Sequence, residues 1–348
     1  MADPAPEPGR RRRPRYRGTH PRSFGEKYKE HAPERYPELV EHVRGRGMTP
    51  AGQHIPILVA EVLEALALEP GQRGVDGTLG WGGHARRILE RIAPGGTLLG
   101  LDVDPLELPK TEARLRALGH EEGALLVRRT NFAALRALLF ELGWNDGVDF
   151  VFVDLGVSSM QIDEPARGFT FKSDAPLDMR MNPARGLSAA QWLERAEPGQ
   201  LAQVLREGAD EPHAQRIAAA LCARRGKLRT TQELAQAVRA ALPAHAREDE
   251  AERSTRRVFQ ALRIEVNDEF GVLETLLRAL PECLRPAGRA ALLTFHSGED
   301  RRVKKSFEAG VRAGLYAECN ADVIRASPEE QRANPRSSSA KLRWARRA

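Results

Sequence analysis

At 348 residues the chain is longer than a typical single domain, and its 29% charged and 41% hydrophobic residues are ordinary for a globular protein. It has no apolar run of about 18 residues and no signal-peptide core, which argues against a membrane protein or a secreted one. Three widely spaced cysteines form neither a disulfide framework nor a zinc motif. A net charge of +6 weakly favours a polyanionic partner. We therefore expect a cytoplasmic protein with one large domain or two moderate ones.

Residues 1–50 form the first segment, which is rich in proline, arginine and glycine and includes the run Arg10 to Arg13. No periodic apolar pattern appears until Tyr36, so this segment is predicted to be a disordered basic arm. Such an arm either strengthens RNA binding through phosphate contacts or is a solvated extension without a role. The sequence leaves both readings open.

From about residue 51 to 166, apolar runs alternate with amphipathic ones, which predicts a parallel sheet with helices between its strands. Strands are predicted at 73–80, 97–103, 124–130 and 149–155, and helices at 83–93, 106–118 and 132–142.

The first of these strands ends in a glycine-rich turn, VDGTLGWGGHARRIL, followed twenty residues after Gly82 by Asp102. Glycines let a ligand approach the backbone, and an acid at the end of the next strand can bind ribose hydroxyls. The unit therefore predicts an adenosine-containing cofactor. Gly80, Gly82 and Ala85 satisfy the dinucleotide pattern, whereas the turn also suits S-adenosylmethionine, so both cofactors remain open.

Two further positions follow strands of the same sheet and should lie at the same cleft, because ligands of such sheets bind at the carboxyl ends of the strands. Asp154 ends the strand VFVD; it could orient an amine nucleophile, hold the cofactor, or cap its own loop. Phe132 follows the third strand, where its ring could stack on adenine or pack in the core.

Residues 167–250 contain no convincing strand and read as an inserted helical domain, with helical runs at 188–206, 211–225 and 230–243. The insertion opens with RGFTFKSDAPLDMRMN, a loop of interleaved arginine, aromatic and acidic residues. Phe169 and Phe171 could stack on an unpaired base while Arg167 and Arg180 contact phosphates. The competing reading is a linking loop tied by salt bridges.

Residues 251–348 return to the alternating pattern and bring the predicted strands to seven. We expect a long helical stretch at 252–280, strands at 288–295, 315–324 and 338–346, and a helix at 300–313. His296 and Ser297 follow the first of these strands on the cleft side, and Arg301 and Arg302 begin a basic helix face. A structural role for the histidine is an equally good reading.

Together these segments resemble the MraW-type methyltransferases over about residues 53–348. The resemblance rests on motifs in the same order, among them HIPILVAEVL, LDVDP, VDLGVSSMQID, RRVFQALRIEVNDE, LTFHSGEDRRVKK and NPRSSSAKLRWARR. It implies a class I, Rossmann-like α/β fold whose seven-stranded sheet is formed by residues 51–166 and 251–348. It also implies S-adenosylmethionine as cofactor, bound by Gly82, Gly83, His84, Asp102, Phe132, Asp154 and Gln161.

By the same resemblance, the reaction is methylation of the N4 amine of a cytidine in small-subunit (16S) ribosomal RNA, near the decoding centre. Catalytic candidates are Asp154, His296 and Ser297, no metal is expected, and the substrate is expected within the small subunit, with a homodimer as a further expectation. Candidate RNA contacts are Arg167, Phe169, Phe171, Arg180, Arg301 and Arg302. A nicotinamide-dependent oxidoreductase and a catalytically silent RNA-binding assembly protein are the alternatives.

Overall fold

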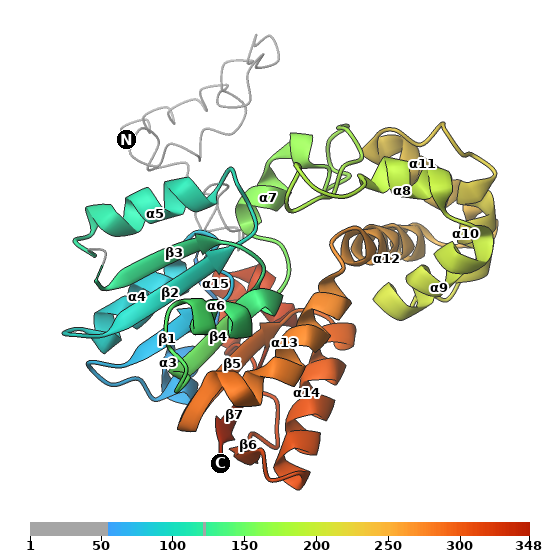
Figure 1. The fold of residues 1–348 in the computed structure, drawn as a ribbon. Helices are drawn as coiled ribbons and strands as arrows, with labels where there is room; N and C mark the ends of the chain where they lie inside the picture. Colours follow the sequence, from blue (N-terminus) through green and yellow to red (C-terminus); the bar gives the residue numbers. More distant parts are fainter. Residues whose placement is uncertain (1–54, 121–122) are drawn as a thin grey trace, which may run out of the picture.

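A computed structural model describes residues 55–120 and 123–348, so the basic arm predicted at 1–50 lies outside the described residues. A seven-stranded sheet with the order β3-β2-β1-β4-β5-β7-β6 forms the centre of the molecule (Figure 1). Its strands are β1 (Arg73–Asp76), β2 (Thr97–Asp102), β3 (Leu125–Arg129), β4 (Val148–Asp154), β5 (Leu284–Thr294), β6 (Tyr316–Cys319) and β7 (Lys341–Arg347). The predicted α/β class and its seven strands are confirmed.

Strands β1 to β5 pair in parallel, and β7 runs antiparallel to both β5 and β6. From β1 the chain builds outward through β2 to β3, then returns to place β4 on the other side of β1. In open α/β sheets such a reversal of strand order leaves a crevice at the carboxyl ends of the strands. The cleft is therefore expected where β1, β2 and β4 end.

Helices cover both faces of the sheet because successive strand residues point to opposite sides. Val151 and Val153 pack toward α6 (Leu135–Glu141), α13 (Glu269–Cys283) and α14 (Ser297–Arg312). Phe150 and Phe152, which alternate with them, pack toward α3 (Val59–Leu66), α4 (Gly83–Ile92) and α5 (Leu108–Ala117). The near-continuous apolar run of β4 is thus buried on both faces.

A separate helical lobe lies beside the sheet and has its own hydrophobic core (Figure 1). Its helices are α8 (Ala189–Arg195), α9 (Pro198–Ala209), α10 (Ala214–Cys222), α11 (Thr231–Ala241) and α12 (Glu248–Val266). The buried residues of this core run from Leu177 to Leu262, because the apolar stripe of α12 packs against α9. The lobe core therefore extends beyond the boundary at residue 250 expected from the sequence.

The structure divides two helical stretches that the sequence presents as continuous. Pro198 at the first turn of α9 separates it from α8, since proline cannot continue a helix. The stretch at 252–280 breaks at Asp268, whose backbone is left-handed with φ of 50°. The strand predicted at 315–324 is shorter, ending at Cys319. The breaks at Pro198 and Asp268 each separate two helices.

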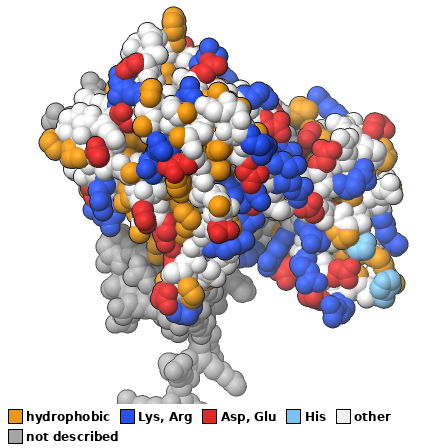
Figure 2. All heavy atoms as spheres, turned by 90° about the horizontal axis from the view of Figure 1, so that it is seen from below, with side chains coloured by type: hydrophobic (Ala, Val, Ile, Leu, Met, Phe, Trp, Pro, Cys, Tyr) orange, Lys and Arg blue, Asp and Glu red, His pale blue; other side chains and the backbone are white. Residues whose placement is uncertain are grey.

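No helix among the described residues is long and apolar enough to cross a bilayer. Figure 2 shows one face of the molecule, on which Lys and Arg side chains are mixed with Asp and Glu. Its basic side chains gather where the sheet part and the helical lobe meet.

Candidate functional site

The glycine turn between β1 and α4 forms one wall of a cavity of about 380 Å³ at the carboxyl edge of the sheet. Gly80 and Gly82 have positive φ values of 47° and 83°, and a Cβ on Gly82 would lie 3.0 Å from the Thr111 side chain. Only glycine suits this tightly packed left-handed turn. Gly82 is also the N-cap of α4, so its helix presents free N–H groups toward the cavity.

Asp102 ties the second strand to this turn. Its Oδ2 accepts a hydrogen bond from the Gly80 N–H at 2.8 Å, and its Oδ1 accepts one from the Asp104 N–H at 2.9 Å. Burial raises the pKa of the Asp102 carboxyl despite these bonds. Each oxygen keeps a lone pair for a further donor. All seven predicted cofactor residues line this one cavity: Gly82, Gly83, His84, Asp102, Phe132, Asp154 and Gln161.

His84 and Asp154 approach each other across the cavity floor. The His84 Nε2 lies 2.8 Å from the Ile57 carbonyl oxygen, its Nδ1 lies 3.7 Å from Asp154 Oδ2, and its ring packs 4.7 Å from that of Phe152. These contacts fix the imidazole in a buried position. His84 therefore shapes the cavity from the first turn of α4.

Asp154 has an oxygen available to a ligand. Its backbone N–H donates to the Thr78 hydroxyl at 2.6 Å, but its buried Oδ1 has no hydrogen-bond partner among the described residues. Burial, followed by the carboxylates of Asp76 and Glu299, raises the pKa of Asp154 to about 8. Burial likewise raises the pKa of Asp76 to about 7. The cavity floor thus carries two carboxyl groups that titrate near neutral pH.

Gln161 and Arg167 meet on the buried carboxylate of Asp104. The Gln161 amide and the Arg167 guanidinium each donate to Asp104 Oδ2 at 2.8 Å, and Arg167 also bonds the carbonyl oxygens of Arg180 and Met181. Arg167 is only 9% exposed. Its guanidinium is thus engaged in holding the loop, which matches the salt-bridged reading of this segment.

The remaining residues predicted to contact RNA also have protein partners. Phe169 and Phe171 pack on the core of the helical lobe, and the Phe171 ring lies 5.1 Å from that of Phe259. Arg180 forms a 2.7 Å ion pair with Asp178. On α14, Arg301 lies 3.7 Å from Asp210, and Arg302 bonds Glu274 at 2.9 Å. Each arginine is paired in this structure.

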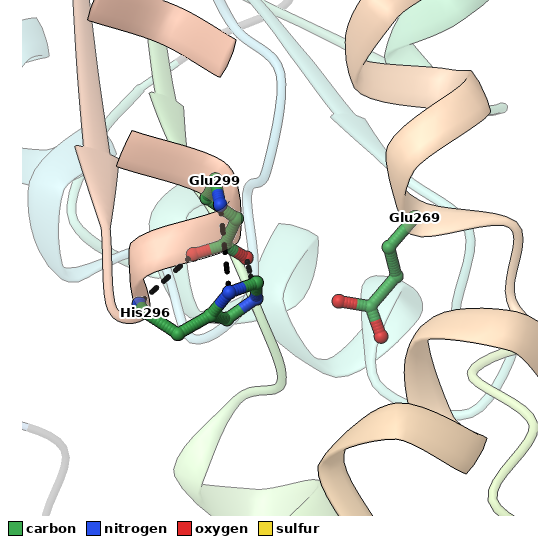
Figure 3. A group of neighbouring side chains, drawn as sticks. All are labelled: Glu269, His296 and Glu299. Carbon is green, nitrogen blue, oxygen red and sulfur yellow. Dashed lines mark hydrogen bonds and ion pairs between the residues drawn. The ribbon is translucent and has the colours of Figure 1, made fainter. Parts of the chain in front are cut away.

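The segment after β5 places Glu299 at the cavity, whereas His296 and Ser297 do not line it. Glu299 Oε2 accepts the backbone N–H of Phe295 at 2.8 Å, and its Oε1 lies 3.1 Å from His296 Nε2 (Figure 3). Contact with His296 lowers the pKa of Glu299 despite burial, which acts in the opposite direction. The Ser297 hydroxyl donates to Asp210. His296 does not line the cavity and contacts Glu299, so it can hold the Glu299 carboxylate in position.

Among the described residues, Glu269, His296 and Glu299 place one ligand atom each within 4.8 Å of one another, close enough to hold a metal ion (Figure 3). Arg263 donates two hydrogen bonds to the Glu269 carboxylate, at 2.8 and 2.9 Å. A guanidinium that takes both carboxylate oxygens supplies the positive charge a metal would otherwise supply. We therefore describe this group as a buried ion network.

Sequence reasoning missed Glu299, Arg263 and Asn267 as cavity residues. Glu299 lies three residues after the candidate His296, within the motif LTFHSGEDRRVKK, so the sequence did point to its neighbourhood. Arg263 and Asn267 lie within RRVFQALRIEVNDE, a motif of the resemblance, but the motif did not indicate which of its residues line the cavity.

Known proteins of one family are similar to this chain over most of its length. A model of the MraW methylase family matches residues 51–348. Ribosomal RNA small subunit methyltransferase H 1 of Lachnoclostridium phytofermentans is 47% identical, covering 98% of this chain and 94% of that protein. Ribosomal RNA small subunit methyltransferase H 2 of Alkaliphilus metalliredigens is 48% identical, covering 98% and 99%. The similarity thus includes both the sheet and the helical lobe.

Proposed function

Because the chain belongs to the MraW methylase family, we propose that it methylates the N4 amine of a cytidine in small-subunit ribosomal RNA. It is an S-adenosylmethionine-dependent methyltransferase of ribosomal RNA. The family assignment replaces the nicotinamide-dependent alternative that the glycine turn alone left open.

The cavity residues suit this cofactor. S-adenosylmethionine supplies an electrophilic methyl group on a sulfonium centre. The bare backbone of Gly82 and the start of α4 would receive its polar groups, and the remaining lone pairs of Asp102 would accept the ribose hydroxyls. Phe132 lines the same cavity beyond β3, where its ring would contact the adenine.

The single observation that carries the cytosine proposal is that carboxylate acceptors and a guanidinium donor line the same cavity. The carboxyl groups of Asp154 and Glu299 and the guanidinium of Arg263 all line this cavity. Cytosine presents the complementary edge, an amine beside the N3 and O2 acceptors, whereas uracil presents a carbonyl in place of the amine.

Arg263 has a donor left for that edge. Its Nε and one terminal nitrogen bond Glu269, while the other terminal nitrogen makes no hydrogen bond with the described residues. The side chain keeps 16% exposure and lines the cavity. We assign Arg263 to N3 or O2 of the base and Asp154 to its amine.

The cytosine nitrogen gains a methyl group and loses a proton, and it is a weak nucleophile because its lone pair is delocalised into the ring. We assign to Asp154, whose Oδ1 has no hydrogen-bond partner among the described residues, the role of orienting the amine and taking that proton. Because the pKa of Asp154 is raised to about 8, this carboxyl group is mostly protonated at neutral pH, and its ionised fraction is the form that accepts the proton. His296 acts through Glu299, and Ser297 remains a candidate without a contact in the cavity.

The test uses purified protein, tritiated S-adenosylmethionine, and small-subunit ribosomal RNA from cells that lack the gene, offered both free and as assembled subunits. Mass mapping of the digested RNA should identify N4-methylcytidine. In Asp154→Asn we expect kcat to fall by about 100-fold or more, with S-adenosylhomocysteine affinity retained. Methylation at another atom would overturn the cytosine proposal, and wild-type protein that binds RNA without transfer would establish the silent assembly role.

The assembled small subunit is the proposed substrate, because a base must leave its stack to reach a buried site and an ordered RNA can present it already unstacked. A protein that methylates the assembled small subunit acts in the cytoplasm. Faster methyl transfer to free RNA than to assembled subunits would contradict the proposal that the subunit is the substrate. A homodimer stays a prediction, which light scattering of the purified protein tests.

A further inference from the structure

A second cavity, of about 520 Å³, opens beside the cofactor cavity. One wall comes from the end of β3, and the other comes from the segment 181–186 and the junction between α12 and α13. The two cavities share five lining residues: Val103, Thr130, Asn131, Met181 and Asn267. We name this second cavity the side groove. It extends the cofactor cavity outward between the sheet and the helical lobe.

Two exposed arginines line the side groove, Arg129 from β3 and Arg185 from the opposite segment. Neither side chain makes a hydrogen bond or ion pair with any residue that the structure describes. This distinguishes them from Arg167 and Arg180 of the neighbouring loop, which are both paired. An arginine without a protein partner keeps all its donors for a ligand.

Among the described residues that line the groove, Asp268 is the one acidic residue, and its carboxylate is directed to the helix that follows. A Cβ placed on Gly271 would lie 2.5 Å from Asp268 Oδ1, so that oxygen lies over the first turn of α13. There it faces the positive end of the helix dipole. The two arginine charges therefore dominate the electrostatics of the groove.

We propose that the side groove holds an RNA nucleotide adjacent to the target cytidine, with Arg129 and Arg185 contacting phosphate oxygens on either side of it. The proposal rests on the proposed function and deepens it, since it names the path of the substrate. An RNA chain whose target base enters the cofactor cavity must continue away from that cavity. The shared lining residues make the side groove a continuous route for it. Arginine recognises phosphate through paired donors.

The test compares Arg129→Gln/Arg185→Gln with a control of equal charge change, Arg91→Gln/Arg206→Gln. The control arginines also come one from each part of the molecule, are exposed, and have no side-chain partner among the described residues. Methyl transfer to small-subunit RNA should show a KM raised about tenfold or more in the groove variant, with kcat at saturating RNA near wild type. The control should match wild type.

Direct binding separates this proposal from the proposed function. Anisotropy of a labelled single-stranded RNA of about twelve nucleotides should show weaker binding by the groove variant, and a slope of log Kd against log salt smaller by about 1.4, the value for two phosphates. This result is independent of whether methyl transfer is detected.

Three outcomes overturn the proposal. Equal RNA affinity and equal salt dependence in the groove and control variants would show that the arginines do not contact RNA. Equal losses in both variants would show a diffuse charge effect. A loss of S-adenosylhomocysteine affinity in the groove variant, measured by calorimetry, would assign the groove to the cofactor instead.

Discussion

Three aspartates that line the same cavity have different hydrogen-bond partners. Asp102 accepts two backbone N–H groups and keeps lone pairs at the cavity. Asp104 is buried beneath it and takes two side-chain donors, from Gln161 and Arg167. Asp154 keeps one oxygen without a partner among the described residues. The same residue type thus has three different hydrogen-bonding states around one cavity.

For Asp102→Ala we expect S-adenosylhomocysteine to bind about 10- to 100-fold more weakly, because the hydrogen bonds proposed between this carboxylate and the ribose would be lost. Asp102→Asn, which retains one acceptor oxygen, should lose less. Calorimetric titration measures both affinities. Unchanged affinity in the alanine variant would remove Asp102 from the cofactor site.

The raised pKa of Asp154 predicts a pH dependence of stability. The folded pKa, about 8, lies above the ordinary value of 3.8, so folding favours the protonated form. This stabilisation is complete below about pH 4 and is lost as the pH rises through 8. Thermal unfolding without cofactor should show a smaller fall in Tm from pH 6 to pH 9 in Asp154→Asn than in wild type. Parallel curves would refute the assignment.

At the scale of elements, the loop at 167–182 is held to the sheet through the buried pair of Arg167 and Asp104, which are 2.8 Å apart. Removing the arginine leaves a buried carboxylate without its cation. We expect Arg167→Ala to lower the free energy of unfolding by about 3–5 kcal/mol, measured in urea. Arg325→Ala, an exposed control, should change it by less than about 0.5 kcal/mol. Wild-type stability with weakened RNA binding would instead restore the phosphate-contact reading of Arg167.

The junction between α12 and α13 shows which element boundaries a sequence reveals. The helical run predicted at 188–206 was wrong to continue through Pro198, which is a local signal for the break after Glu197. The break at Asp268 has no such signal. Its neighbour Asn267 donates to the Met179 carbonyl oxygen and accepts from the Met181 N–H, and both partners are more than eighty residues away. These long-range bonds stabilise a break that no local pattern requires.

At the scale of the whole molecule, the cavity is built mainly from the carboxyl edge of the sheet, while the helical lobe contributes the end of α12. Hydrogen exchange should therefore show protection by S-adenosylhomocysteine at the glycine turn and around Asp102, Phe132 and Asp154. Helices α9 to α11 should exchange at unchanged rates, because they line neither cavity. Protection confined to those helices would place the cofactor elsewhere.

The sequence by itself determined the alternation of strands and helices, the glycine turn, and the positions of Asp102 and Asp154 at strand ends. These are local properties, since periodicity and turn chemistry depend on neighbouring residues. Parallel pairing then brings all strand ends to one edge, so the seven predicted cofactor residues could be expected to lie together.

Only the tertiary structure decided which charged side chains have a protein partner and which are available to a ligand. Arg167 and Arg180 were expected to meet phosphates but have carboxylate partners, whereas Arg129 and Arg185 have none among the described residues. A charge in a sequence does not reveal its partner, because ion pairs form between segments far apart along the chain. The pair of Arg167 and Asp104 spans 63 positions. Whether an arginine binds RNA or holds the fold is therefore settled by packing, not by local pattern.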